Sequence, residues 1–98
     1  RTGAALLGDL REEEFATRIV DDAIGRMGGL DIVVLNAAYQ ADRDSLATLS
    51  TAEFDRVFRT NLYALVFTAR AALPRLTAGA SIIVTSSVQA FQPSPGLI

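Results

Sequence analysis

The sequence predicts an α/β fold, a doubly wound parallel sheet with helices packed on its faces. Three short apolar runs, 4–7, 30–35 and 81–85, alternate with two stretches of helical periodicity. The second and third runs are rich in Ile and Val, which is typical of strands buried on both faces of a parallel sheet. The order strand-helix-strand-helix-strand favours right-handed crossovers. A chain of 98 residues forms at most one such domain.

The first half of the chain is expected to form a strand followed by a helix. Residues 4–7 are an apolar run that predicts a buried first strand. Asp9 and Glu12 have the spacing of a helix N-terminal capping pair. Apolar residues recur every three or four positions over 15–27, and Gly28-Gly29 ends that pattern, so we expect a helix over this span.

The longest predicted helix begins at the capping box Ser50-Thr51-Ala52-Glu53 and ends near Pro74. Its predicted core positions are Phe54, Val57, Phe58, Leu62, Leu65, Val66, Ala69, Leu73 and Leu76. The other side carries Tyr63, Phe67 and Ala71, so the helix is apolar on more than one face. Because helices of this kind are buried, we expect this one to contact a second subunit.

Composition excludes several classes of function. A net charge of -2 without basic clusters argues against a nucleic acid or a membrane as partner. The chain has no cysteine and no histidine, so we expect no metal site. No apolar stretch is long enough to span a bilayer. All nine basic residues are arginines, so a mechanism that needs lysine cannot be completed within this sequence.

Polar residues stand where the predicted strands end. Asn36 follows the second strand, and Ser86 and Ser87 follow the third. Ligands of open parallel sheets bind at the carboxyl ends of the strands. Two interpretations stay open, because such residues either line a ligand site or simply begin loops. Asn61 is the unusual residue of the long helix: a core-facing amide needs a hydrogen-bond partner, and it is either a satisfied structural group or part of a site.

Two other patterns that could indicate catalysis are not assigned a catalytic role. Tyr39 and Arg43 have the interval of a Tyr-x-x-x-Lys pair, but arginine stays protonated and the pair is expected in a loop rather than on a helix. Acyl transfer by a nucleophilic serine lacks a histidine, a lysine base and a G-x-S-x-G turn.

Four segments occur in a fixed order and carry a resemblance to a known family. They are Gly8-Asp9-Leu10, Leu35-Asn36-Ala37-Ala38, Phe58-Arg59-Thr60-Asn61-Leu62 and the stretch from Ser81 to Ala90. The intervals are 25 residues from Asn36 to Asn61 and 26 from Asn61 to Ser87. In these features the chain resembles the central portion, from the third to the fifth strand, of the short-chain dehydrogenase/reductase family. The resemblance implies that residues 1–98 are part of an NAD(P)-binding, Rossmann-like domain.

The resemblance also implies an activity and residue roles. The activity is hydride transfer between NAD or NADP and the carbonyl or alcohol carbon of a small molecule. Ser87 and Asn61 would be catalytic, Ser87 by holding the substrate oxygen and Asn61 by anchoring a water in a proton relay. The residues that would contact the cofactor are Asp9, Leu10, Asn36, Ala37, Ala38, Thr85 and Ser86. Members of the family commonly form tetramers through the long helix and the next helix, so we expect a homotetramer. We expect the protein to be cytoplasmic.

This sequence departs from the family pattern in several places. Leu35 and Ala38 replace an Asn and a Gly of the motif after the fourth strand. The glycine-rich phosphate loop and the second strand are absent, and the acid/base Tyr and its Lys would fall just past Ile98. In the strand order 3-2-1-4-5-6 the first strand here has no neighbour, so we expect the isolated chain not to fold natively. A non-catalytic nucleotide-binding or scaffold protein on the same fold is the alternative.

Overall fold

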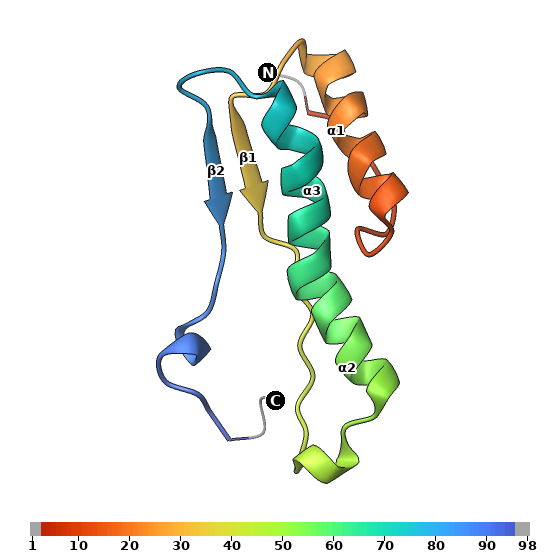
Figure 1. The fold of residues 1–98 in the computed structure, drawn as a ribbon, viewed down its shortest axis with the longest axis vertical. Coiled ribbons are helices and arrows are strands. Elements are labelled where there is room, and N and C mark those ends of the chain that lie inside the picture. Colours follow the sequence, from red (N-terminus) through yellow and green to blue (C-terminus); the bar gives the residue numbers. More distant parts are fainter. Residues whose placement is uncertain (1–2, 96–98) are drawn as a thin grey trace.

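The computed structural model describes residues 3–95, which form an α/β arrangement. Its helices and strands are, in order, α1 (Glu13–Met27), β1 (Ile32–Leu35), α2 (Thr51–Phe58), α3 (Ala64–Ala72) and β2 (Ser81–Val84). A π-helical segment, Arg59–Tyr63, joins α2 to α3, so that the two helices form one long rod (Figure 1). Short 3-10 turns cover Leu46–Thr48, Leu73–Arg75 and Val88–Ala90.

The two strands are parallel neighbours, as the sequence predicts. Val33 pairs with Ile82 and Leu35 pairs with Val84. Paired residues of neighbouring strands point to the same face of a sheet, so these four side chains share one face. The long rod connects the two strands, which is the crossover connection that a parallel pair requires.

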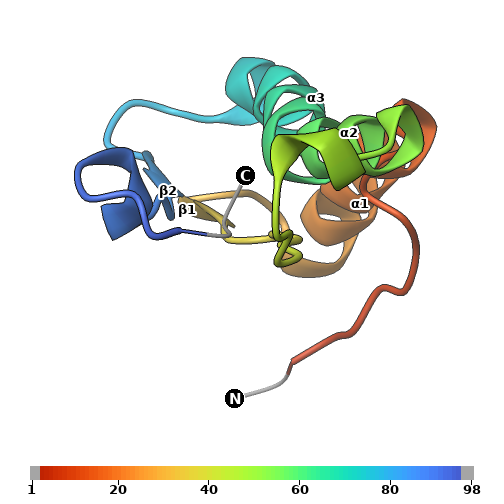
Figure 2. The ribbon, with the colours of Figure 1, turned by 90° about the horizontal axis from the view of Figure 1, so that it is seen from below.

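The predicted strand over 4–7 does not form. Residues 3–7 have no strand pairing, and the side chain of Leu7 is 92% exposed. Figure 2 shows this segment running away from the helices and the sheet. A strand is stable only when a neighbour satisfies its backbone groups, and the described residues supply none at this position.

The helices lie on one face of the sheet (Figure 2). Val33 and Leu35 are half-buried on that face, while Ile32 and Val34 on the opposite face are 63% and 58% exposed. Among the described residues, therefore, helices cover one face of the sheet, and the strand residues that were expected to be buried on both faces are exposed on the other. The radius of gyration of 15.9 Å is larger than the roughly 13 Å of a compact domain of this length.

The buried core lies between α1 and α3, which pack side by side. Phe15, Ala16 and Val20 of α1 meet the small residues Ala64 and Ala72 of α3. Small side chains let the two helix backbones approach closely. The predicted apolar stripe of α1 is thus confirmed over its first two turns, although Met27 at its end is exposed.

The predicted core positions of the long helix are wrong in part. Large side chains that were assigned to the core are substantially exposed, namely Phe54, Phe58, Leu62, Val66 and Leu73. The face that packs on α1 is the one that carries the alanines, and the large side chains lie beside it. Phe54 and Phe58 contact each other, with ring centroids 4.6 Å apart, yet all five side chains remain more than 40% exposed.

Of the three residues predicted to cap or end a helix, Gly28 and Ser50 do so and Asp9 does not. Gly28 ends α1 with a φ of 85°, a conformation that glycine adopts without strain. Ser50 caps α2, since its hydroxyl accepts a hydrogen bond from the Glu53 N–H at 3.2 Å. Asp9 does not cap α1, because Glu12 occupies that position and the Asp9 carboxylate is bound to Arg11. None of the helices in residues 3–95 has the length and hydropathy of a membrane span.

Candidate active site

The carboxyl ends of β1 and β2 bring most of the predicted site residues together. The Thr85 N–H donates to the carbonyl of Leu35 at 3.1 Å, so both strands end side by side. A cavity of about 390 Å³ opens there. Seven of the predicted site residues line it: Asn36, Ala37, Ala38, Asn61, Thr85, Ser86 and Ser87.

A smaller cavity of about 150 Å³ adjoins the first and shares Asn36, Ala37, Asn61 and Thr85 with it. Leu10 lines this second cavity, which places another predicted cofactor residue beside the same strand ends. Asp9, in contrast, lines neither cavity.

Asn61 holds the main chain of Tyr39 through both groups of its amide. The side-chain oxygen accepts from the Tyr39 N–H at 2.7 Å, and the side-chain nitrogen donates to the Tyr39 carbonyl at 2.8 Å. The amide therefore has a hydrogen-bond partner, in a loop 22 residues away, but Asn61 is exposed and does not face a core as the sequence analysis expected. The second N–H and the second lone pair of the amide stay available, so the side chain can still hold the water that we assigned to Asn61.

The backbone around Asn61 is itself unusual. It lies within the π-helical segment Arg59–Tyr63, where the Ala64 N–H bonds to the carbonyl of Arg59, five residues earlier. π-Helical turns are rare and occur frequently at functional sites. Here the wider turn lies at the point where the helix passes the ends of the strands.

Ser87 begins the 3-10 turn Val88–Ala90 and has a defined hydroxyl environment. Its oxygen accepts a hydrogen bond from the Gln89 N–H at 3.2 Å. The hydroxyl proton has no acceptor among the described residues, so it can be donated to an oxygen in the cavity. Ser87 thus begins a turn and also has a hydroxyl proton that a ligand in the cavity can accept.

Asp9 carries a charge that Arg11 stabilises. Its carboxylate accepts from the Arg11 N–H at 2.9 Å and from the guanidinium at 2.9 and 3.0 Å. The hydrogen bond from the Arg11 side chain is the largest cause that lowers the pKa of Asp9 from 3.8 to about 2. The carboxylate is therefore ionised at neutral pH and remains 42% exposed, so it can accept further hydrogen bonds.

Ala38 costs no backbone strain where the family has a glycine. Among the described residues no amino acid other than glycine has a positive φ, and Ala38 is exposed. The backbone at position 38 therefore does not require a glycine. Compared with a glycine, Ala38 only adds a methyl group to the cavity wall.

A group of residues that the sequence analysis missed surrounds Tyr39. Its hydroxyl donates to the Glu53 carboxylate at 2.8 Å, and the guanidinium of Arg56 lies 3.8 Å from the centre of its ring. Arg43 forms an ion pair with the same carboxylate at 3.2 Å. The hydrogen bond to Glu53 raises the pKa of Tyr39 above its usual 10.0, so this phenol is a poor acid. The Tyr39–Arg43 spacing that we set aside therefore marks a real cluster, but not an acid/base pair.

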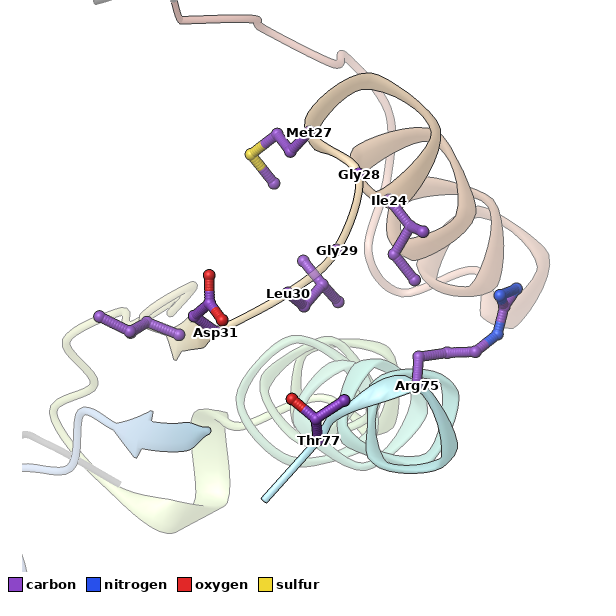
Figure 3. Close-up of a pocket in the computed structure, with 9 residues that line it drawn as sticks. Ile24, Met27, Gly28, Gly29, Leu30, Asp31, Arg75 and Thr77 are labelled. Atoms are coloured by element: carbon purple, nitrogen blue, oxygen red, sulfur yellow. The ribbon is translucent and has the colours of Figure 1, made fainter. Parts of the chain in front are cut away.

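A larger cavity lies at the opposite, amino-terminal end of β1. It measures about 710 Å³ and is bounded by the Gly28–Asp31 turn on one side and by Arg75 and Thr77 on the other (Figure 3). Its other lining side chains are Ile24, Met27, Leu30 and Ile32, which are apolar. No group of three metal-ligating side chains occurs in the described part of the chain.

Comparisons with known proteins agree with this geometry. Residues 2–97 match the protein family described as enoyl-(acyl carrier protein) reductase, which covers nearly the whole chain. The chain belongs to the short-chain dehydrogenase/reductase family. The uncharacterized oxidoreductase YghA of Escherichia coli (strain K12) is 44% identical over all 98 residues, which make up 33% of that protein. This chain therefore spans about a third of the length of the curated relative.

Solved structures of the family have the same fold. A short-chain dehydrogenase from Burkholderia cenocepacia J2315, in complex with NADP, superposes with a TM-score of 0.88 at 30% identity, over 94% of this chain and 38% of that one. The NADH-dependent reductase A1-R′, complexed with NAD, gives a TM-score of 0.80 at 26% identity, over 88% of this chain and 38% of its own. The predicted Rossmann-like, doubly wound parallel fold is thereby confirmed for this central portion.

Proposed function

We propose that the complete protein is an NAD(P)-dependent oxidoreductase that interconverts an alcohol and a carbonyl of a small molecule by hydride transfer. The observation that carries this proposal is the gathering of Asn36–Ala38, Asn61 and Thr85–Ser87 around one cavity at the carboxyl ends of the strands. Membership of the family supports it, since the relatives include dehydrogenases and reductases that were crystallised with NADP or NAD.

The residues of the chain fit a nicotinamide dinucleotide. The ionised, half-exposed carboxylate of Asp9 can accept from the amino group of adenine, and Leu10 supplies apolar surface beside it. The exposed segment Asn36–Ala38 offers main-chain groups to a ribose, and Thr85 and Ser86 offer hydroxyls to the second ribose. When bound, the nicotinamide ring would donate or accept the hydride.

Ser87 and Asn61 have different roles in this proposal. Ser87 donates its free hydroxyl proton to the substrate oxygen, which orients the carbonyl and stabilises the negative charge that develops on it. Asn61 holds Tyr39 and, through it, the loop that begins at Asn36. The remaining N–H of its amide would hold the relay water.

The acid/base group would come from outside this chain. Tyr39 does not serve, because its hydroxyl is bound to Glu53 and its pKa is raised. We propose that a Tyr and a Lys beyond Ile98 supply the proton in the complete protein. The alternative, a non-catalytic nucleotide-binding or scaffold protein on this fold, predicts that these two residues are absent.

The test is an assay of the full-length protein with NADH and NADPH against a panel of aldehydes and ketones. We expect oxidation of at least one reduced cofactor that depends on the carbonyl compound. Binding of a cofactor without turnover of any carbonyl, together with no Tyr and Lys at the expected spacing, would establish the alternative.

We also propose a cytoplasmic homotetramer assembled through α2 and α3. The exposed apolar side chains of these helices, among them Phe58, Leu62 and Val66, need a cover, and a second copy of the same helices would provide one. A cytoplasmic location suits a protein that draws on a pool of free NAD(P)H. A monomeric mass of the full-length protein in solution would contradict the tetramer.

A further inference from the structure

The side chain of Tyr39 is held by two contacts, although the residue lies in a loop. Its hydroxyl donates to Glu53 at 2.8 Å, and its ring lies under the guanidinium of Arg56 at 3.8 Å. Arg43, four residues later in the same loop, joins this cluster through its ion pair with Glu53. We call these four side chains, Tyr39, Arg43, Glu53 and Arg56, the Tyr39 latch.

Glu53 is the centre of the Tyr39 latch. The same carboxylate oxygen accepts from the phenol and lies 3.2 Å from the Arg43 guanidinium. The Glu53 side chain is only 16% exposed, so solvent screens these interactions less than it screens a typical surface pair. Ser50 fixes the backbone of Glu53 as the cap of α2. The latch therefore ties the loop after β1 to a rigid helix start.

The Tyr39 latch lies next to Asn36–Ala38, the segment that we propose to contact the nucleotide. Tyr39 follows Asn36–Ala38 directly, and it lines the same cavity as those residues. Asn61 holds the main chain of Tyr39, and the latch holds its side chain, so position 39 is constrained at both ends of the residue. A segment of three exposed residues attached to a strand on one side and to a fixed residue on the other has little freedom to change shape.

We propose that Tyr39 and Glu53 are positioning residues that set the affinity for the nicotinamide cofactor, because the latch holds Asn36–Ala38 in the shape that binds the nucleotide. The inference rests on the proposed function. Preorganisation lowers the entropy that is lost on binding, so loss of the latch weakens binding without removing any group that touches substrate. The effect is on cofactor affinity and not on the chemical step.

The experiment uses the full-length protein and measures the Kd of NADH and NADPH together with KM and kcat. Tyr39→Phe removes only the hydroxyl, and we expect it to raise the Kd and the KM of the cofactor by about three- to tenfold, as for loss of one hydrogen bond of typical net strength. The kcat at saturating cofactor should stay within about twofold, since the reacting groups are intact. Glu53→Ala should have the same effect, and Glu53→Gln, which keeps an acceptor, should restore part of the affinity.

Two further variants distinguish loss of the Tyr39 latch from a general loss of stability. Tyr63→Phe removes the other tyrosine hydroxyl of the chain, which bonds to no described residue, and should leave the Kd unchanged. The double variant Tyr39→Phe/Glu53→Ala should bind the cofactor no more weakly than the worse single variant, because both changes disable the same unit.

The outcomes distinguish the two proposals. If the unaltered protein binds neither NADH nor NADPH, the proposed function fails and this inference fails with it. If the unaltered protein binds a cofactor and Tyr39→Phe and Glu53→Ala bind it equally well, only the latch is overturned. Additive losses in the double variant, or a fall in kcat with an unchanged cofactor KM, would likewise overturn the positioning role.

Discussion

The two ends of the β1–β2 sheet differ in a way that cavity size does not reveal. The amino-terminal end has the larger cavity, about 710 Å³, whose polar lining residues are Asp31, Arg75 and Thr77 beside four apolar side chains and two glycines (Figure 3). The carboxyl end has a cavity of about 390 Å³ in which most lining residues are polar: two asparagines, two glutamines, two serines, a threonine and a tyrosine. Polar groups that converge on one space, and not the volume of that space, identify the site.

The contrast has a structural cause. At the carboxyl end, the loop after β1 is held by a distant residue, since Asn61 binds Tyr39, and the loop after β2 is held by local hydrogen bonds of Ser87 and Gln89. At the amino-terminal end, the chain enters β1 from a glycine turn that serves to end α1. Substitutions of the same kind at the two ends should therefore have different effects.

The largest expected difference comes from deleting one hydroxyl at each end. Ser87→Ala in the full-length protein should lower kcat by about 100-fold, because it removes the donor to the developing charge on the substrate oxygen. Thr77→Ala, in the amino-terminal cavity, should change kcat by no more than about twofold. Steady-state turnover of the best carbonyl substrate measures both. Equal losses at the two ends would remove the distinction between them.

Asn61→Ala should have the next largest effect. It removes the two hydrogen bonds of Asn61 to the N–H and the carbonyl of Tyr39, which are exposed, so each loss costs about 0.5–1.5 kcal/mol of stability, and it disturbs the loop at Asn36. We expect about a tenfold loss of kcat/KM. Asp31→Asn in the amino-terminal cavity is the control, and chemical denaturation with activity assays gives both quantities. An unaltered unfolding free energy would show that the amide does not hold the loop.

Alanine substitutions of Gly25 in α1 and of Gly28, its C-cap, should change the free energy of unfolding in opposite directions. Gly28 has a φ of 85°, so Gly28→Ala should lower the free energy of unfolding by about 1 kcal/mol. Gly25 lies within the helix with open space around it, so Gly25→Ala should raise that free energy by about 0.5–1 kcal/mol. Neither should alter kcat, since both glycines lie away from the carboxyl end. Thermal unfolding of the two variants checks the signs.

The smallest effect concerns the charge of Asp9. Because its folded pKa of about 2 lies below the usual 3.8, its interaction with Arg11 stabilises the fold above pH 3.8 and is lost as the pH falls through 2. Arg11→Ala should return the pKa of Asp9 toward 3.8, since the hydrogen bond from Arg11 is the main cause of the shift. A carboxyl titration followed by NMR measures it, and a pKa that stays near 2 in the variant would assign the shift to another group.

Local signals predicted part of this structure and long-range contacts decided the rest. Ser50 and Gly28 were predictable because a cap and a left-handed turn involve only neighbouring residues. The role of Glu53 was not, since the capping-box pattern places its carboxylate at Ser50, whereas the structure turns it to Tyr39. The large side chains of the long helix could not be assigned to a face from periodicity alone, because several of its faces are apolar.

By itself, the sequence determined the alternation of helices and strands, the parallel sheet, and the polar residues at the strand ends, because these follow from periodicity and from residue types at fixed positions. It also showed that Asn61 needs a partner. Only the tertiary structure decided that this partner is Tyr39, 22 residues away, and that the Glu53 carboxylate binds the Tyr39 hydroxyl. The physical reason is common to both: a side chain forms a hydrogen bond with a group that the fold brings near, and the spacing along the sequence does not encode that distance.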